Sequence, residues 1–154
     1  MQLKRVVVTG LGALTPIGNN IQEYWNALIS GKSGAAPITY YDTEKHKTKF
    51  ACEVKNFNVE EFIDRKEARR MDKFAQYAIV AGEQAIVDSG ILESNVNKQR
   101  VGVIWGAGIG GLETFQEEVL SYAKGDGTPR FNPFFIPKMI ADIAPAHISM
   151  RNGY

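Results

Sequence analysis

The sequence predicts an α/β protein with a largely parallel sheet flanked by helices. Two short β-branched runs, 4–9 ("KRVVVT") and 100–105, each meet a glycine-rich turn, and helix-forming stretches lie between and after them. Alternation of buried strands and helices is typical of parallel sheets. Two strong strands are few for a sheet that needs both faces covered, so we expect the fold to be incomplete within residues 1–154.

The first expected helix is defined by its ends. Asn20 is a suitable N-cap, and Glu23 completes a capping box with it. Apolar residues recur at helical spacing from Ile21 to Ile29. Gly31 follows them and is expected to end the helix by adopting the left-handed conformation. A short extended segment is then expected at 49–54 ("KFACEV").

A long helix is expected from Arg65 to Asp88, with a stop at Gly90 and Ile91. Further helices are expected at 111–123 and 138–150. The apolar residues expected to form the buried stripe of the long helix are Phe74, Tyr77, Ala78, Ala81 and Ala85.

The composition indicates one ordinary globular domain, with 44% hydrophobic and 23% charged residues. A net charge of +1 gives no general argument for nucleic acid or an anionic membrane as a partner. The single cysteine, Cys52, excludes an internal disulfide and a cysteine-based zinc cluster, and it suits a reducing compartment. No apolar run approaches the length of a membrane span. We therefore expect a cytoplasmic protein without a metal site.

The turn at 106–111 ("GAGIGG") formally matches the dinucleotide-binding pattern G-x-G-x-x-G. The context does not suit a nicotinamide site, because the motif lies far along the chain and the only nearby acid, Asp126, sits in a "GDG" turn. The other glycine-rich loop has Thr15 where the third glycine belongs. Close packing of backbone explains these glycines better, and a nicotinamide oxidoreductase is the least favoured alternative.

Four segments occur together in one order: "KRVVVTGLGALTPIG" at 4–18, "RKEARRMDKFAQYAIVAGEQAIVDSG" at 65–90, "VGVIWGAGIGGL" at 101–112 and "NPFFIP" at 132–137. Together they resemble the N-terminal part of a β-ketoacyl-[acyl-carrier-protein] synthase, most like the type II enzymes of fatty-acid biosynthesis. The resemblance covers essentially the whole chain. It implies the N-terminal portion of a thiolase-like αβαβα fold, with no second domain and with its sheet completed by later strands.

The resemblance also implies an activity. Members of this family elongate fatty acids by a decarboxylating Claisen condensation of malonyl-acyl-carrier protein with an acyl group held as a cysteine thioester. The product is 3-oxoacyl-carrier protein, no metal or organic cofactor takes part, and the enzyme is a homodimer. In the family the nucleophilic cysteine lies just beyond the position of Tyr154. We therefore expect no catalytic residue here and no activity from residues 1–154 alone.

The remaining cysteine and histidines match none of the family's catalytic positions. Cys52 is expected to be an inert thiol, and His46 lies among charged residues and is expected to be solvated. His147, in "APAHISM", is expected to be a helix histidine satisfied by local hydrogen bonds.

A basic stripe is expected on the long helix, because four cations are spaced i, i+3, i+4 and i+7. These residues are Lys66, Arg69, Arg70 and Lys73. By itself such a stripe is a solvated face, but the resemblance implies that Lys66, Arg69 and Arg70 receive the acidic acyl-carrier protein. Arg130 matches a further basic position that contacts the carrier protein in the family. A family member has a second basic residue next to it, where this sequence has Phe131.

The resemblance implies an acyl pocket lined by Ile109 and by Phe135 in "NPFFIP". From composition alone both would be core residues. One alternative of another class stays open: a non-catalytic, chain-length-factor type of partner subunit, which keeps the fold and lacks the nucleophile. The segment after Tyr154 discriminates between the two.

Overall fold

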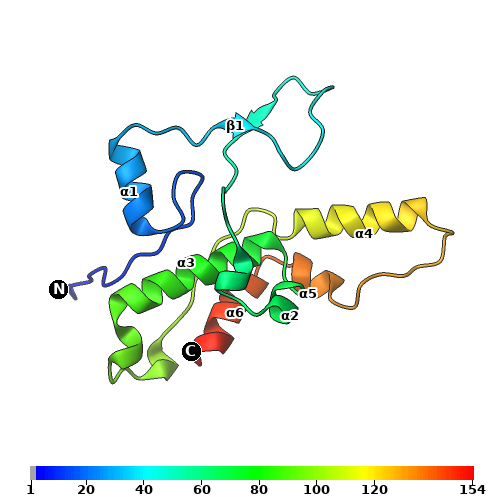
Figure 1. The fold of residues 1–154 in the computed structure, drawn as a ribbon. Helices are drawn as coiled ribbons and strands as arrows, with labels where there is room; N and C mark the ends of the chain where they lie inside the picture. Colours follow the sequence, from blue (N-terminus) through cyan, green and yellow to red (C-terminus); the bar gives the residue numbers. More distant parts are fainter. Residues whose placement is uncertain (1–2) are drawn as a thin grey trace. The chain divides into compact units, whose positions relative to one another are not determined.

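The computed structural model describes residues 3–154 and divides into two compact units. The first unit spans the chain up to Phe57 together with Glu83–Ser94, and the second comprises Asn58–Gly82 and Asn95–Tyr154. Helix α3 (Lys73–Ser89) contributes residues to both units (Figure 1).

In the first unit, helix α1 (Ile21–Ile29) begins and ends as its sequence predicts. The side chain of Asn20 accepts the backbone N–H of Glu23 at 2.9 Å. The carboxylate of Glu23 accepts from the N–H of Asn19 rather than of Asn20, also at 2.9 Å, so the capping box is displaced by one residue. Gly31 adopts φ +67° just past the helix, which confirms the left-handed stop.

The first unit also contains the one sheet formed within residues 3–154, a two-stranded antiparallel hairpin (Figure 1). Strand β1 (Ala36–Pro37) pairs with β2 (Phe50–Ala51), with Ala36 opposite Ala51. Strand β2 lies within the extended segment expected at 49–54. The Thr39 hydroxyl donates to the Glu53 carboxylate at 2.7 Å and closes the hairpin beyond the strands.

The expected parallel sheet is not formed within residues 3–154. Segments 4–9 and 100–105 form no strand. All side chains of 4–9 are exposed, Val6 to 90%, whereas in 100–105 Ile104 is 98% exposed and Val101 and Val103 are half-buried. A strand exists only when a neighbouring backbone accepts and donates its hydrogen bonds. A β-branched run therefore indicates a preference for extended backbone, and it becomes a strand only beside a second extended segment.

The expected helix from Arg65 to Asp88 is in fact two helices, α2 (Arg65–Ala68) and α3. Asp64 caps α2 by accepting the N–H of Lys66 at 2.9 Å. The chain then turns, and the backbone carbonyl of Asp72 accepts the first hydrogen bonds of α3. Aspartate competes with helical backbone for hydrogen bonds and favours such starts, which explains the break.

Helix α3 ends as expected, because Gly90 adopts φ +64° directly after Ser89. The N–H of Ile91 bonds to the Ser89 hydroxyl at 3.2 Å rather than to a helix carbonyl. Of the expected buried stripe only Ala78 is fully buried. The buried residues of α3 are Ala75, Ala78, Ile79 and Val80, and the other expected members are half-buried.

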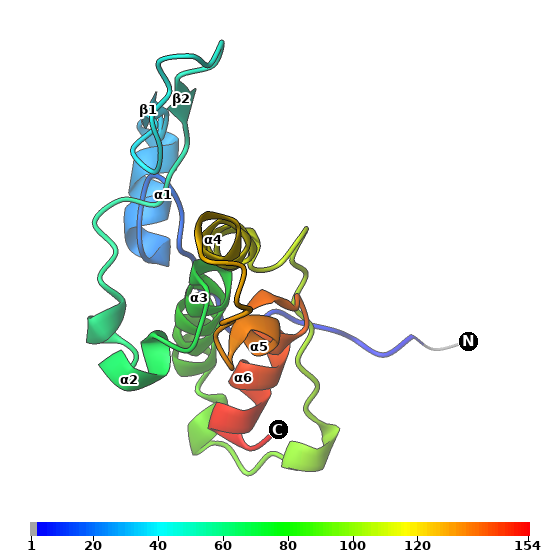
Figure 2. The same cartoon turned by 90° about the vertical axis from the view of Figure 1, so that its right-hand side faces the viewer.

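The second unit holds most of the buried apolar side chains. Helix α4 (Leu112–Lys124) confirms the helix expected at 111–123, whereas 138–150 is divided between α5 (Phe135–Met139) and α6 (Ile143–Asn152). Helix α5 contacts both α4 and α6 (Figures 1 and 2). The buried apolar residues of this unit are Ile63, Ala68, Met71, Ala75, Ala78, Ile79, Val80, Ala144 and Ile148.

Three short 3-10 helices complete the secondary structure of residues 3–154: η1 (Val59–Glu61), η2 (Ile91–Glu93) and η3 (Lys98–Arg100). Helix α3 packs on α6 within the second unit, where a Cβ on Gly82 would lie 3.0 Å from the Cδ1 of Ile148.

Candidate functional site

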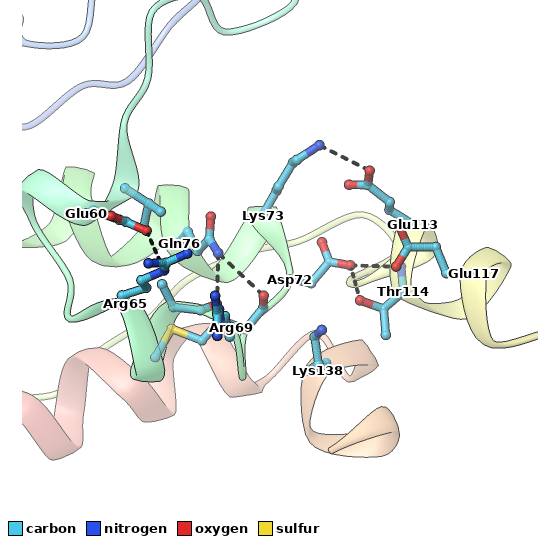
Figure 3. Close-up of a pocket in the computed structure, with 13 residues that line it drawn as sticks. Glu60, Arg65, Arg69, Asp72, Lys73, Gln76, Glu113, Thr114, Glu117 and Lys138 are labelled. Atoms are coloured by element: carbon cyan, nitrogen blue, oxygen red, sulfur yellow. Dashed lines mark hydrogen bonds and ion pairs between the residues drawn. The ribbon is translucent and has the colours of Figure 1, made fainter. Parts of the chain in front are cut away.

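A solvent-open pocket of about 370 Å³ lies within the second unit and is lined by residues of η1, α2, the N-terminal turns of α3 and α4, and α5 (Figure 3). Its lining carries equal numbers of basic and acidic side chains. The basic ones are Arg65, Arg69, Lys73 and Lys138, and the acidic ones are Glu60, Asp72, Glu113 and Glu117.

The floor of the pocket is a buried hydrogen-bonded pair, Asp72 and Thr114. The carboxylate Oδ2 of Asp72 accepts the backbone N–H of Thr114 at 3.0 Å and its hydroxyl at 2.6 Å. Thr114 lies in the first turn of α4, so one carboxylate at the start of α3 also satisfies the start of α4. Sequence reasoning missed this residue, although an Asp before a long helical stretch is the signal of an N-cap.

Two of the four basic residues are neutralised by acids of the same lining. Lys73 Nζ lies 3.1 Å from Glu113, and Arg65 Nε lies 3.3 Å from Glu60. Both pairs are partly exposed and contribute little to stability. Within residues 3–154 no ion pair is formed by the other two cations of the lining or by Glu117.

The expected stripe of four cations on one helix face is wrong, because the helix is broken after Ala68. Lys73 belongs to α3 and is paired with Glu113. Lys66 and Arg69 remain exposed on α2 and at its C-cap, and Arg69 also lines the pocket.

Arg70 and Arg130, the other two expected docking residues, have different surroundings. The guanidinium of Arg70 lies over the ring of Phe134, 4.9 Å from its centroid. Arg130 lies between α4 and α5, outside the pocket lining, and pairs with Asp126 at 3.1 Å on an exposed surface. Hydrogen bonds from Thr128 hold the pKa of Asp126 below its ordinary value, which favours the charged partner of Arg130.

The two residues expected in an acyl pocket lie in the second unit, and neither lines the charged pocket. Ile109 is 72% exposed in the turn before α4. Phe135 begins α5 and is half-buried, with ring centroids 6.2 Å from Phe115 and 5.8 Å from Phe131. A third ring contact, between Phe131 and Tyr122 at 5.5 Å, extends this aromatic cluster along α4.

The glycine-rich turn packs tightly at its end. The N–H of Gly111 donates to the carbonyl of Met139 at 2.8 Å, and a Cβ on Gly111 would lie 2.6 Å from the carbonyl of Lys138. Gly110 adopts φ +83°, and a Cβ there would clash with the Met139 carbonyl. Close backbone packing, expected from the sequence, is therefore confirmed at these two glycines.

Cys52 is exposed, and the ring of His46 lies 5.3 Å from that of Tyr41 on the hairpin loop. His147 is half-buried on α6, and its side chain makes no hydrogen bond within residues 3–154, so the expected local bond is absent. Burial lowers the pKa of His147; the nearby Glu67 opposes this shift.

Within residues 3–154, no three His, Cys, Asp or Glu side chains gather as ligands for a metal ion. No helix in this range is both long and apolar enough to cross a bilayer.

Comparison of the sequence with known proteins identifies a family. Residues 3–154 match the model of the β-ketoacyl synthase N-terminal domain. The chain is 45% identical over 153 residues to 3-oxoacyl-[acyl-carrier-protein] synthase 2 of Synechocystis sp.. It is 46% identical over 152 residues to the protein of the same name from Staphylococcus aureus. Both alignments cover 99% of this chain, which spans 36% of the length of these relatives.

Solved structures show the same fold. The ishigamide ketosynthase/chain length factor is similar with a TM-score of 0.78 and 27% identity, over 95% of this chain and 36% of that one. A β-ketoacyl synthase from Burkholderia phymatum gives a TM-score of 0.76 at 24% identity, over 97% and 37% of the two chains. The backbone is thus that of the ketosynthases, and the sequence match extends over all the described residues. The chain belongs to the β-ketoacyl synthase family, and its residues 3–154 match the family's N-terminal domain.

Proposed function

We propose that the protein carrying this chain elongates fatty acids as a 3-oxoacyl-[acyl-carrier-protein] synthase. An acyl group passes from acyl-carrier protein to a cysteine thiolate as a thioester. Malonyl-carrier protein loses carbon dioxide, and the resulting carbanion attacks the thioester carbonyl, which releases the cysteine and gives 3-oxoacyl-carrier protein. The supporting observation is the 45–46% identity to synthases of this name across 99% of the chain.

The nucleophilic cysteine belongs, in this proposal, to a segment outside residues 1–154, and the protein acts in the cytoplasm without a metal or organic cofactor. The test is to incubate the protein, as its gene encodes it in full, with acyl- and malonyl-carrier protein. Mass spectrometry is expected to detect an acylated cysteine peptide and 3-oxoacyl-carrier protein. Absence of both products would refute the proposed activity.

The second candidate is a non-catalytic subunit of the chain-length-factor type. It is favoured by one observation, the likeness to the ishigamide ketosynthase/chain length factor. Such a subunit would acquire no acyl group, and it would stimulate or alter the product length of a separate catalytic synthase. The same mass-spectrometric experiment, repeated with and without a catalytic synthase, distinguishes the two functions.

Within the proposed synthase, the cations Lys66, Arg69, Arg70 and Arg130 dock the acidic acyl-carrier protein. Lys66 and Arg69 are exposed and form no ion pair within the described chain, so both are available to an acidic surface. Exposed charges of this kind increase association rates and orient a partner of opposite charge. Arg130 contributes less, because Asp126 already neutralises it.

Reversing charge on the docking residues is expected to weaken carrier-protein binding. The double variant Arg69→Glu/Arg70→Glu should raise the Kd for acyl-carrier protein by roughly tenfold or more at low salt, and less at high salt. Lys45→Glu is the single-charge control, since Lys45 is exposed and belongs to the first unit, whereas the docking residues belong to the second. Unchanged affinity of the double variant at low salt would refute the docking proposal.

Ile109 and Phe135 line the acyl pocket in this proposal, and a second copy of the protein covers Ile109 in a homodimer. An isoleucine that is 72% exposed is consistent with such a covered position. Ile109→Phe is expected to shorten the longest acyl chain that the enzyme accepts, because the larger ring takes up pocket volume. An unaltered chain-length profile would count against the assignment.

A further inference from the structure

Lys138 and Arg69 approach the same pocket from two different elements, α5 and the C-cap of α2 (Figure 3). They differ from the other two cations of the lining, which are each held by a glutamate at 3.1 or 3.3 Å. Within residues 3–154 neither Lys138 nor Arg69 forms an ion pair. Two unneutralised cations that share one pocket attract an anion.

The position of Lys138 is fixed by the contacts of α5. The N–H of Lys138 donates to the carbonyl of Phe134 at 2.8 Å, so the two residues lie one turn apart on the same face of the helix. Phe134 carries the guanidinium of Arg70 over its ring. At its other end α5 is held by the bond from Gly111 to Met139. The face of α5 with Lys138 is therefore turned toward the segment that contains Arg69 and Arg70.

None of the acidic side chains of the pocket forms an ion pair with Lys138 or Arg69. The Oδ2 of Asp72 is occupied by two hydrogen bonds from Thr114. Glu60 and Glu113 are engaged by their own cations. Glu117 is exposed on α4 and forms no ion pair with either cation.

We propose that Lys138 and Arg69 together bind one carboxylate of the acyl-carrier protein, an aspartate or glutamate side chain that enters the pocket. A guanidinium offers two parallel donors to a carboxylate, and an ammonium adds a third charge-assisted hydrogen bond. The inference rests on the proposed docking function and assigns it a further residue, Lys138, which no sequence pattern indicated.

The test uses the complete protein and titrates it with acyl-carrier protein at low ionic strength, by calorimetry or fluorescence anisotropy. Lys138→Met and Arg69→Ala are each expected to raise the Kd roughly three- to tenfold. The double variant is expected to raise the Kd by less than the product of the two single effects, because both cations serve one carboxylate. Lys138→Arg is expected to keep most of the affinity, and the matched control Lys45→Met, in the first unit, to change it less than twofold.

The outcomes separate this inference from the docking proposal. If Arg69→Ala weakens binding while Lys138→Met does not, the role of Lys138 is refuted and the docking function stands. If the two single effects multiply in the double variant, the shared carboxylate is refuted. If the unmodified protein does not bind acyl-carrier protein at all, the docking function itself fails. Lys138→Met retains the apolar part of the side chain, and an unchanged thermal midpoint shows that the variant folds.

Discussion

Removal of the Asp72 carboxylate is expected to destabilise the second unit. In the unmodified protein the backbone N–H and the hydroxyl of Thr114 donate to Asp72 Oδ2 at 3.0 and 2.6 Å. In Asp72→Ala both donors lose this acceptor. A buried donor left without a partner costs about 1–3 kcal/mol. The pocket admits water to this pair, which reduces the penalty, so we expect a loss of about 2–4 kcal/mol in the free energy of unfolding.

Two further variants separate the contribution of the Asp72 charge from that of the Thr114 hydroxyl. Asp72→Asn keeps an acceptor and the side-chain shape but removes the charge, and it is expected to cost about 1 kcal/mol, since charge-assisted bonds are roughly twice as strong as neutral ones. Thr114→Val removes only the hydroxyl donor. Combined with Asp72→Ala in a double-mutant cycle, it should show a coupling of about 1–2 kcal/mol.

The assay is urea denaturation, together with hydrogen exchange at the Thr114 amide, which reports the local bond directly. Asp142→Ala is the matched control, because Asp142 stands at the N-terminus of α6 and its side chain makes no capping hydrogen bond. We expect it to change stability by less than about 0.5 kcal/mol. A loss below about 1 kcal/mol in Asp72→Ala, with unchanged exchange at Thr114, would refute the assignment of Asp72 as the shared cap of α3 and α4.

Two other predictions concern single side chains. Because burial lowers the pKa of His147 in the folded protein, the unfolded chain binds the proton more tightly, and the free energy of unfolding should fall as pH drops through about 6.5. His147→Gln should lose part of this dependence between about pH 7.5 and 5.5 in urea titrations, and His46→Gln should keep it. Gly110→Ala combines left-handed strain with a clash against the Met139 carbonyl, whereas Gly127→Ala, at almost the same φ, meets open space. Thermal unfolding should show the first variant to be less stable than the second by at least about 1 kcal/mol, and equal losses would contradict the packing of the turn.

Features that depend on a few consecutive residues could be predicted from the sequence. The cap at Asn20, the left-handed glycines at 31 and 90, and helix α4 all follow from interactions within one or two turns of the chain. The four family segments, in their order along the chain, also indicate the β-ketoacyl synthase family from the sequence alone, and the family match over residues 3–154 confirms it.

The break between α2 and α3 was only partly indicated by the neighbouring residues. The apolar periodicity predicted one helix from Arg65 to Asp88, whereas the structure has two. Asp72 is a suitable N-cap for the second helix, but the apolar pattern continues through it and favoured a single helix. The error placed Lys73 on the basic stripe. In the structure the turn before α3 separates Lys73 from Arg69, and Glu113 neutralises it.

Three features were decided by tertiary structure alone. Pairing of the β-branched runs depends on a second backbone, and within residues 3–154 neither 4–9 nor 100–105 has one. The Asp72–Thr114 bond joins residues 42 positions apart, and the presence of Lys138 and Arg69 in the lining of one pocket depends on where α5 packs. Sequence determines which groups are available and how the nearby backbone bends, because those energies are local. Which donor meets which acceptor across the molecule is set only when helices pack, since that choice depends on the burial and shape of every element at once.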